Sequence, residues 1–212
     1  MTSKKEKIFV YGASGHAKVV VDIIEKQGLY EIAFLVDDDL SLKGQEFFGY
    51  RVVGGKDDLL EQTEAPPRAI VAIGSNRARR HVANWLEGNN FTLISTIHPS
   101  AQIGREVIIG PGTVVMANVS INPATRIGRN VIINTKASID HDCTIDDNVH
   151  IAPGATLCGT VVVGDGSFVA AGATVIPNLT IGKGVTVGAG AVVIRDLPNE
   201  VTVVGNPAKV KA

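Results

Sequence analysis

The second half of the chain carries a strict six-residue period. Every sixth residue from Ile97 to Val193 is Ile, Val or Leu, which makes seventeen aliphatic positions in a row. The fourth residue after each of these positions is small or aliphatic throughout the same stretch. A helix buries a residue about every 3.6 positions and an ordinary strand every second one, so neither explains a period of six. The pattern predicts a hexapeptide β-helix.

The period also predicts where the side chains of this β-helix point. Each hexad is expected to form one flat side of a triangular prism, with its aliphatic anchor inside. Three hexads then close one coil, which gives about five to six coils. Glycine often follows an anchor, as at Gly110 and Gly164. We expect Gly or Asn at the corners, where they accept backbone angles that other residues resist.

The first part of the chain has a different composition and a different pattern. Nine of the ten aromatic residues precede residue 92. A strand over 7–11, a helix over 17–27 and a strand over 32–36 form a βαβ unit. A buried strand over 69–73, a helix over 77–87 and a strand over 92–97 follow. We therefore predict a small Rossmann-like α/β lobe over 1–96, with room for one nucleotide, and the β-helix over 97–212.

Composition excludes several classes of partner. The 212 residues have a net charge of −1, so no global field attracts nucleic acid or an anionic membrane. No apolar run reaches the roughly 18 residues of a membrane span, and residues 1–6 lead into a strand rather than a signal peptide core. We expect a cytoplasmic protein. Its two cysteines, Cys143 and Cys158, are expected to be reduced, and no metal site is expected.

Three groups of residues stand at one edge of the predicted sheet. Gly12-Ala13-Ser14-Gly15 lies between the first strand and helix, where backbone N–H groups and a helix N-terminus favour a phosphate. Asp37 and Asp38 end the second strand, where an acid can contact a ribose or a base. Gly74 ends another strand and could close the crevice. The alternatives are a plain tight turn, a solvated acidic loop and a simple helix cap.

The most unusual part of the β-helix is the sequence Asp140-His141-Asp142. The hexad register places Ile139 and Cys143 inside and turns His141 outward. A neighbouring carboxylate can orient an imidazole and raise its basicity, as a general base near neutral pH requires; the alternative is a solvated surface histidine. The inward register buries the Cys143 thiol, which makes it an improbable nucleophile.

A second histidine, His150, follows nine residues after His141, which is one and a half faces of the prism. The two imidazoles of one chain should therefore point apart. They could meet only across a seam between subunits, so this spacing predicts an oligomer.

The chain resembles a known family, the bacterial sugar O- and N-acyltransferases that join a nucleotide-sugar-binding lobe to a left-handed β-helix. The resemblance covers nearly the whole chain. It rests on these segments: Tyr11–His16, Ala72–Asn76, Ile97–Ala101, Ile133–Thr135, Ile139–Cys143 and Val204–Lys209.

The resemblance implies a homotrimer that uses acetyl-CoA to acetylate the 4-amino group of a nucleotide-linked amino-deoxysugar for surface glycans or glycoproteins. It implies that His141 is the general base, that His150 contacts acetyl-CoA, and that the backbone at Ala171 and Ala189 lines the pantetheine arm. One member of the family carries a glutamate where this chain has Asp142, which leaves open whether Asp142 or Asp140 pairs with the imidazole. The implied nucleotide-sugar contacts are Ser14, Gly15, His16, Asp37 and Gly74.

Several alternatives remain at this level. O-acetylation of a sugar hydroxyl, as in sialic acid O-acetyltransferases, and N-acetylation of GDP-perosamine fit the same fold. A binding protein without turnover, a dinucleotide-dependent enzyme and a purely structural solenoid belong to other classes. The His141 cluster and the nucleotide lobe argue against the solenoid, and the short lobe argues against the dinucleotide enzyme. UDP is the first expectation for the nucleotide, with GDP or CMP open, and the sugar and the pathway are also open.

Overall fold

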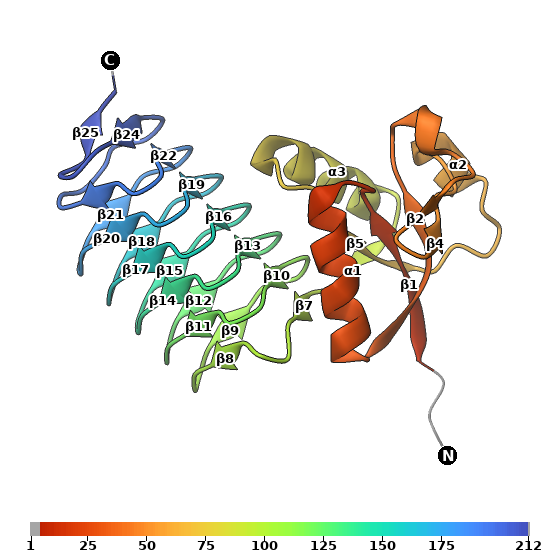
Figure 1. Cartoon of the computed structure of the whole chain (residues 1–212), viewed down its shortest axis with the longest axis horizontal. Coiled ribbons are helices and arrows are strands. Elements are labelled where there is room, and N and C mark those ends of the chain that lie inside the picture. The colour runs from red at the N-terminus through yellow and green to blue at the C-terminus, as the bar shows by residue number, and fades with distance from the viewer. Residues whose placement is uncertain (1–4, 212) are drawn as a thin grey trace. The chain divides into compact units, whose positions relative to one another are not determined.

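The computed structural model describes residues 5–211 and divides after Ile97 into two compact units (Figure 1). Residues 1–4, part of the start that was predicted not to be a signal peptide, lie outside the described residues. Within 5–211, no helix has both the length and the apolar character that crossing a membrane requires.

A four-stranded parallel sheet forms the centre of the first unit, with the strand order β2-β1-β5-β6. Strand β1 continues through a tight turn into helix α1, and strand β5 leads into helix α3, as predicted. The bounds are β1 Glu6–Tyr11, α1 Gly15–Gln27, β2 Tyr30–Val36, β5 Arg68–Val71, α3 Asn76–Gly88 and β6 Thr92–Leu93.

Helix α1 forms where apolar residues recur at helical spacing. Val20, Ile23 and Ile24 are buried on one face, and Gly28 ends the helix with a φ of 70°. Only glycine adopts this left-handed conformation without a steric cost, so the predicted helix end is confirmed.

The strand predicted over 92–97 is in fact two short strands. Strand β6 pairs with β5, and the chain then leaves the sheet before β7 (Thr96–Ile97). At that point the Thr96 hydroxyl donates a hydrogen bond of 2.8 Å to Gln27 Oε1 at the end of α1. Thr96 thus contacts the end of α1 and not a neighbouring strand of this sheet.

The segment between β2 and β5 contains short elements that show no periodicity. A 3-10 turn η1 (Leu40–Leu42) and an antiparallel hairpin of β3 (Glu46–Phe47) and β4 (Tyr50–Arg51) precede a one-turn helix α2 (Lys56–Leu60). Because none of them spans two turns of helix or a full strand, the sequence pattern gave no signal for them.

The second unit is a left-handed parallel β-helix, as predicted. Its three faces carry the strand orders β24-β22-β19-β16-β13-β10, β23-β20-β17-β14-β11-β8 and β21-β18-β15-β12-β9. Each residue pairs with the one eighteen positions later, as Ile121 does with Ile139, so three hexads close a coil. The two-residue strands are β8 Gln102–Ile103, β9 Ile108–Ile109, β10 Val114–Val115, β11 Ser120–Ile121, β12 Arg126–Ile127, β13 Ile132–Ile133, β14 Ser138–Ile139, β15 Thr144–Ile145, β16 His150–Ile151, β17 Thr156–Leu157, β18 Val162–Val163, β19 Phe168–Val169, β20 Thr174–Val175, β21 Thr180–Ile181, β22 Thr186–Val187 and β23 Val192–Val193.

The aliphatic anchors fill the interior of the prism. From Val115 to Val193 every anchor is buried. Ile103 is 38% exposed, and Ile109 is half-buried, because the first coil of this unit has a neighbouring coil on one side only. At the other end β24 (Thr202–Val204) turns back into β25 (Lys209–Val210) as an antiparallel pair.

The expectation of Gly or Asn at the corners is confirmed at most corner positions, such as Gly112, Asn118 and Gly190, and glycine has a second role beside them. A positive φ recurs every sixth residue from Glu106 to Gly190, three positions after each anchor, and several of these residues are neither Gly nor Asn. The glycines directly after anchors have no positive φ. A Cβ at Gly110 or Gly164 would lie 2.6 or 2.8 Å from the backbone of the next coil. These glycines are required by close packing between coils.

Candidate active site

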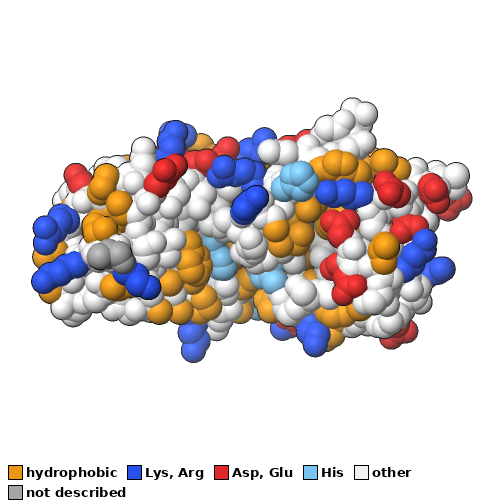
Figure 2. All heavy atoms as spheres, turned by 90° about the horizontal axis from the view of Figure 1, so that it is seen from above, with side chains coloured by type: hydrophobic (Ala, Val, Ile, Leu, Met, Phe, Trp, Pro, Cys, Tyr) orange, Lys and Arg blue, Asp and Glu red, His pale blue; other side chains and the backbone are white. Residues whose placement is uncertain are grey.

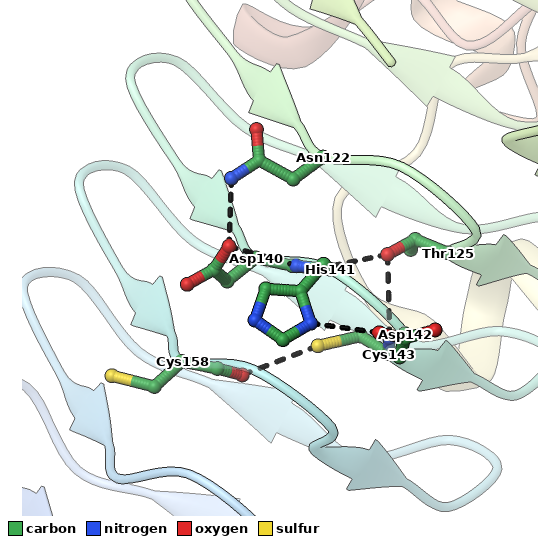
Figure 3. Close-up of polar contacts among 7 residues, drawn as sticks. All are labelled: Asn122, Thr125, Asp140, His141, Asp142, Cys143 and Cys158. Atoms are coloured by element: carbon green, nitrogen blue, oxygen red, sulfur yellow. Dashed lines mark hydrogen bonds and ion pairs between the residues drawn. The ribbon is translucent and has the colours of Figure 1, made fainter. Parts of the chain in front are cut away.

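His141 lies at the corner of the prism that follows β14, with Asp140 between it and the strand. Its side chain is 56% exposed, so the predicted outward orientation is confirmed. Asp142 is the corner residue with the left-handed backbone, at a φ of 58°. Its carboxylate Oδ2 lies 2.7 Å from Nδ1 of His141 (Figure 3).

Asp140 has a different role from Asp142. Its Oδ1 accepts the backbone N–H of His141 at 2.8 Å and the side-chain amide of Asn122 at 2.7 Å. The Asn122 hydrogen bond and then the His141 N–H hold the pKa of Asp140 below its usual range. Asp142 therefore contacts the imidazole, while Asp140 fixes the backbone that carries it.

The electrostatics of this corner make His141 more basic. The hydrogen bond to Asp142 raises the pKa of His141 above its usual value, and the charge of Asp140 adds to this effect. An ionised carboxylate only accepts hydrogen bonds, so Nδ1 is the donor in the contact with Asp142. In the neutral ring, Nε2 then carries a lone pair that can accept a proton.

Two residues from neighbouring coils shape the same corner, and the sequence reasoning missed both. The Thr125 hydroxyl donates to the carbonyl of Asp140 at 2.8 Å and accepts the N–H of Cys143 at 3.3 Å, so it joins both ends of the His141 turn (Figure 3). A Cβ at Gly159 would lie 2.8 Å from the ring of His141. Thr125 comes eighteen residues before Cys143, and Gly159 comes eighteen residues after His141, which is one coil in each case. A search of the sequence at this spacing would have identified both residues.

Cys143 is inside the prism, 1% exposed, as predicted. Burial raises the pKa of its thiol, which donates to the carbonyl of Cys158 at 3.2 Å. Both cysteines are free thiols, and Cys158 is half-buried. Because thiolate is the reactive form, the raised pKa argues against Cys143 as a nucleophile.

The three residues assigned to acetyl-CoA lie along another face. His150 is in β16, with Nε2 3.1 Å from the Asn134 amide nitrogen and its ring 5.2 Å from that of Phe168. Ala171 and Ala189 are exposed and follow β19 and β22, the next two strands of the same face. They stand eighteen residues apart, so they occupy equivalent positions in successive coils.

In the first unit, the glycine turn and the acidic residues contact each other. The N–H of Gly12 donates to Val36 O at 2.7 Å, and the N–H of Ala13 donates to Asp37 Oδ2 at 2.7 Å. The Tyr11 hydroxyl donates to Asp38 Oδ1 at 2.6 Å. Both carboxylates are therefore tied to the turn and its strand, although Asp38 stays exposed.

The start of α1 leaves polar groups available. Ser14 is the N-cap residue of α1, but its side chain makes no capping hydrogen bond, and Ser14 and Gly15 are both exposed. His16 Nε2 is buried and has no hydrogen-bond partner within the described residues. Burial and then the charge of Arg79 lower the pKa of His16 to about 4, so its ring is neutral at pH 7.

Gly74 belongs to the turn before α3. Ser75 caps that helix through its hydroxyl, which accepts the Ala78 N–H at 3.4 Å. Arg79 is fully buried and donates to the carbonyls of Ile73 and Gly74 at 3.3 and 3.2 Å. The buried guanidinium of Arg79 thus fixes the backbone of the turn that was predicted to close the nucleotide crevice.

Among residues 5–211, no group of three or more His, Cys, Asp and Glu side chains is arranged to hold a metal ion.

Comparison with known proteins finds a matching family for each of the two units. The PglD N-terminal domain family matches residues 7–86, and the bacterial transferase hexapeptide (six repeats) family matches residues 124–159 and 160–195. UDP-N-acetylbacillosamine N-acetyltransferase from Bacillus subtilis (strain 168) is 37% identical over 125 residues, 53% of this chain and 52% of that protein. The match thus spans about half the length of this relative.

Solved structures match over almost the whole chain. PerB from Caulobacter crescentus, in complex with CoA and GDP-perosamine, is 41% identical with a TM-score of 0.91 and covers 97% of both chains. The acetyltransferase domain of PglB from Neisseria gonorrhoeae FA1090, in complex with acetyl coenzyme A, is 39% identical with a TM-score of 0.90, over 98% of this chain and 100% of that one.

These matches define the class as a bacterial transferase with hexapeptide repeats. More closely, the chain belongs to the family of nucleotide-sugar N-acetyltransferases that carry a PglD N-terminal domain. The resemblance noted from the sequence motifs is confirmed.

Proposed function

We propose that this protein transfers the acetyl group of acetyl-CoA to the 4-amino group of a nucleotide-linked amino-deoxysugar. The observation that carries the proposal is the 2.7 Å contact between His141 Nδ1 and Asp142, which leaves Nε2 of an exposed, basic imidazole available. The relatives support it, since their names include UDP-N-acetylbacillosamine N-acetyltransferase and their complexes contain CoA with GDP-perosamine or acetyl coenzyme A.

His141 is the general base in this mechanism. The neutral sugar amine attacks the thioester carbonyl, and a C–N bond forms as the carbonyl becomes tetrahedral. His141 Nε2 takes the proton that the amine nitrogen loses, and Asp142 stabilises the imidazolium through Nδ1. When the tetrahedral intermediate collapses, the C–S bond breaks and the thiolate of CoA takes the proton. The products are the acetamido sugar and CoA.

The first unit binds the nucleotide sugar in this proposal. The exposed helix start at Ser14 and Gly15 suits a phosphate, and Gly12, whose own N–H is bound to Val36 O, lets the turn approach it. The unpartnered Nε2 of neutral His16 offers a further polar contact. The remaining contacts come from Asp37, Asp38 and Gly74. Residues 1–96 are thus the substrate lobe, and residues 97–212 are the acetyltransferase domain.

Acetyl-CoA binds along the face that carries His150, Ala171 and Ala189. His141 is on another corner, so a complete site needs two chains, and we include a homotrimer in the proposal. Acetyl-CoA and sugar nucleotides are cytoplasmic metabolites, which places the reaction in the cytoplasm. The product would supply a glycosyltransferase that builds a surface polysaccharide or glycoprotein glycan.

A substrate panel tests the function. The purified chain is assayed for thiol release from acetyl-CoA with UDP-linked and GDP-linked 4-amino sugars, the same sugars with a 4-hydroxyl, and CMP-linked and free sialic acid. We expect turnover with at least one amino sugar and none with its hydroxyl analogue. Turnover with hydroxyl sugars alone would establish O-acetylation instead, and no turnover with any acceptor would refute the proposal.

Replacement of the base tests the mechanism. We expect His141→Ala to lower kcat by about 10²- to 10⁴-fold, the usual contribution of a positioned acid-base group, with the affinity for CoA retained. His81→Ala, at an exposed position of α3, is the matched control and should keep kcat unchanged. Near-normal turnover of His141→Ala would remove the base from the mechanism.

A further inference from the structure

Asp140 has one carboxylate oxygen that the fold leaves unused. Its Oδ1 accepts two hydrogen bonds, at 2.7 Å from the side-chain amide of Asn122 and at 2.8 Å from the N–H of His141. Its Oδ2 has no hydrogen-bond partner and forms no ion pair within residues 5–211. The two hydrogen bonds to Oδ1 restrict the rotation of the carboxylate and therefore set the direction of Oδ2.

In the two adjacent coils, no basic residue stands beside this oxygen. Residues eighteen apart are equivalent in the β-helix, so the neighbours of Asp140 are Asn122 and Cys158, and those of His141 are a proline and a glycine. Figure 2 shows several Lys and Arg side chains of the β-helix at its C-terminal end instead, at the left of the view. The hydrogen bonds from Asn122 and His141 keep the pKa of Asp140 below its usual range, so an ionised carboxylate is open to a ligand.

The unused oxygen of Asp140 and Nε2 of His141 open on the same side of the corner. In Figure 3 both point to the left of the view, away from Asp142, which contacts the other ring nitrogen of His141. The charge of Asp140 raises the pKa of the His141 ring, so the carboxylate and the imidazole are close to each other. An ionised carboxylate and the lone pair of a neutral imidazole only accept hydrogen bonds. Together they present two acceptors to one ligand group.

We propose that these two acceptors select an amine over a hydroxyl as the acetyl acceptor, with Asp140 as the specificity-determining residue. The inference rests on the proposed function, which places the acceptor at Nε2 of His141. A neutral primary amine has two N–H bonds, one for Nε2 and one for Oδ2, and its lone pair then remains for the thioester carbon. The proton on Nε2 is the one that the nitrogen loses, and the N–H on Oδ2 remains in the acetamido product.

A sugar hydroxyl cannot satisfy both acceptors. It has a single O–H bond, so a hydroxyl that donates to His141 turns an oxygen lone pair towards the carboxylate of Asp140. An acceptor left without a donor costs binding free energy, and a site built for one more N–H rejects the ligand that lacks it. Asp140 thus favours N-acetylation over O-acetylation by the number of hydrogens that the acceptor offers.

Asp140→Asn tests this role, because it reverses the polarity of one atom. The asparagine keeps an oxygen for the N–H groups of Asn122 and His141 and places an NH₂ group where Oδ2 was. Calorimetry compares a 4-amino nucleotide sugar with its 4-hydroxyl analogue, at a pH above the pKa of the sugar amine, so that attraction to an ammonium ion does not contribute. We expect Asp140→Asn to bind the amino sugar about 10- to 100-fold more weakly, as the loss of a hydrogen bond to a charged group predicts, and the hydroxyl analogue at least as tightly as the wild type.

Two further variants separate acceptor choice from a structural role. Asp147→Asn is the matched control, because Asp147 also accepts a backbone N–H from the adjacent coil, that of Arg129 at 2.9 Å, but follows β15 on another corner, and it should keep both affinities. Asn122→Ala removes one of the two hydrogen bonds that orient the Asp140 carboxylate and should weaken the amino sugar alone, about three- to tenfold. Equal weakening of both ligands in Asp140→Asn and Asn122→Ala would show a purely structural role and overturn the proposal. Unchanged affinity of Asp140→Asn for the amino sugar would also overturn it.

Failure of the proposed function gives a different result. If neither sugar is acetylated but Asp140→Asn weakens the amino sugar alone, the amine selectivity stands and the reaction must be reassigned. If the amino sugar is acetylated and Asp140→Asn keeps its kcat/KM on the plateau of the pH profile, the reaction stands and Asp140 has no part in acceptor choice. Comparable turnover of both sugars by the wild type would likewise overturn the selectivity.

Discussion

The two aspartates on either side of His141 make different contacts, because Asp140 comes before the corner and Asp142 is the corner residue itself. Asp142, in the left-handed corner conformation, turns its carboxylate back to Nδ1 of the imidazole. Asp140 precedes the corner, and its carboxylate instead accepts the backbone N–H of His141. Their contributions to catalysis should therefore differ in kind.

Removal of the charge of Asp142 should change the pH dependence of the reaction. The hydrogen bond to Asp142 is the main cause of the raised pKa of His141, so Asp142→Asn should move the acidic limb of the kcat profile to lower pH. The loss of kcat should be smaller than in His141→Ala. Asp146→Asn is the control, because Asp146 follows β15 on another face and its replacement removes the same charge away from His141. An acidic limb that does not move would show that Asp142 has no influence on the base.

Thr125 should affect turnover through the backbone of the His141 turn. Thr125→Val removes two hydrogen bonds without changing the side-chain volume much, and we expect it to lower kcat about tenfold and to destabilise the fold by about 1–3 kcal/mol. Thr113→Val is a matched control, because the Thr113 hydroxyl also bridges two coils, from Val131 N–H to Gly128 O. It should cost similar stability with no loss of kcat.

Kinetics and thermal unfolding of both variants distinguish positioning from stability. Thr125→Ser keeps the hydroxyl and should restore most of the turnover. Equal kcat values in Thr125→Val and Thr113→Val would show that the bridge is only structural.

Sequence reasoning found His141 but not the residues that support it. The histidine and its acids are adjacent in the chain, so a local pattern reveals them. Thr125, Asn122 and Gly159 act from neighbouring coils, across separations of fifteen to eighteen residues, and each is an ordinary corner or strand-end residue in its own hexad. Their role depends on the closing of a coil, which only a comparison at eighteen residues would reveal.

At the scale of elements, the starts of α1 and α3 are coupled through buried polar groups. His16, in the first turn of α1, is kept neutral by burial and by the charge of Arg79 from α3. The same Arg79 holds the carbonyls of the turn before α3. The first unit thus contains a histidine that the unfolded chain protonates more readily than the folded one.

The stability of the first unit should fall as pH falls from about 6.5 to 4. Above this window the histidine is neutral in both states and has no effect. Below 6.5 the unfolded chain gains a proton that folded His16 accepts only near its pKa of about 4, so unfolding becomes easier, by roughly 3 kcal/mol in total. His16→Asn should remove this part of the pH dependence.

Denaturant unfolding followed by the fluorescence of Trp85 measures this effect. Trp85 is the single tryptophan of the chain and lies in α3, so it reports the first unit. Carboxyl groups also titrate in this pH range. The decisive quantity is therefore the difference between the wild type and His16→Asn in the slope of unfolding free energy against pH. Equal slopes of unfolding free energy against pH would contradict the prediction.

The pattern of elements was predictable where a period extended over many residues. The β-helix register followed from seventeen anchors, and the βαβ unit followed from two strands around an amphipathic helix. The segment 40–60 gave no such signal, because its hairpin and its one-turn helix are fixed by contacts within that segment and with β2. The division of 92–97 into two strands is a tertiary effect, since β6 pairs with β5 while Thr96 of β7 contacts Gln27 at the end of α1.

At the scale of the whole molecule, the prism separates the two histidines by its own geometry. His141 is on the corner after β14, and His150 lies in β16 on another face. If both act on one acetyl group, they must come from different chains. In a closed trimer every seam would then join the His141 corner of one subunit to the His150 face of its neighbour.

Mixed assemblies test this arrangement. His141→Ala and His150→Ala chains are unfolded together in equal amounts, refolded and assayed at an acetyl-CoA concentration far below the KM of His150→Ala. A seam has both histidines when a His150→Ala chain supplies His141 and a neighbouring His141→Ala chain supplies His150. Each of these conditions is met with a chance of one half, so we expect roughly a quarter of the wild-type activity.

The double variant mixed with His141→Ala is the control and should stay inactive. A stable, active monomer in sedimentation would rule out the trimer. A trimer whose mixed population regains no activity would place both histidines of each site in one chain.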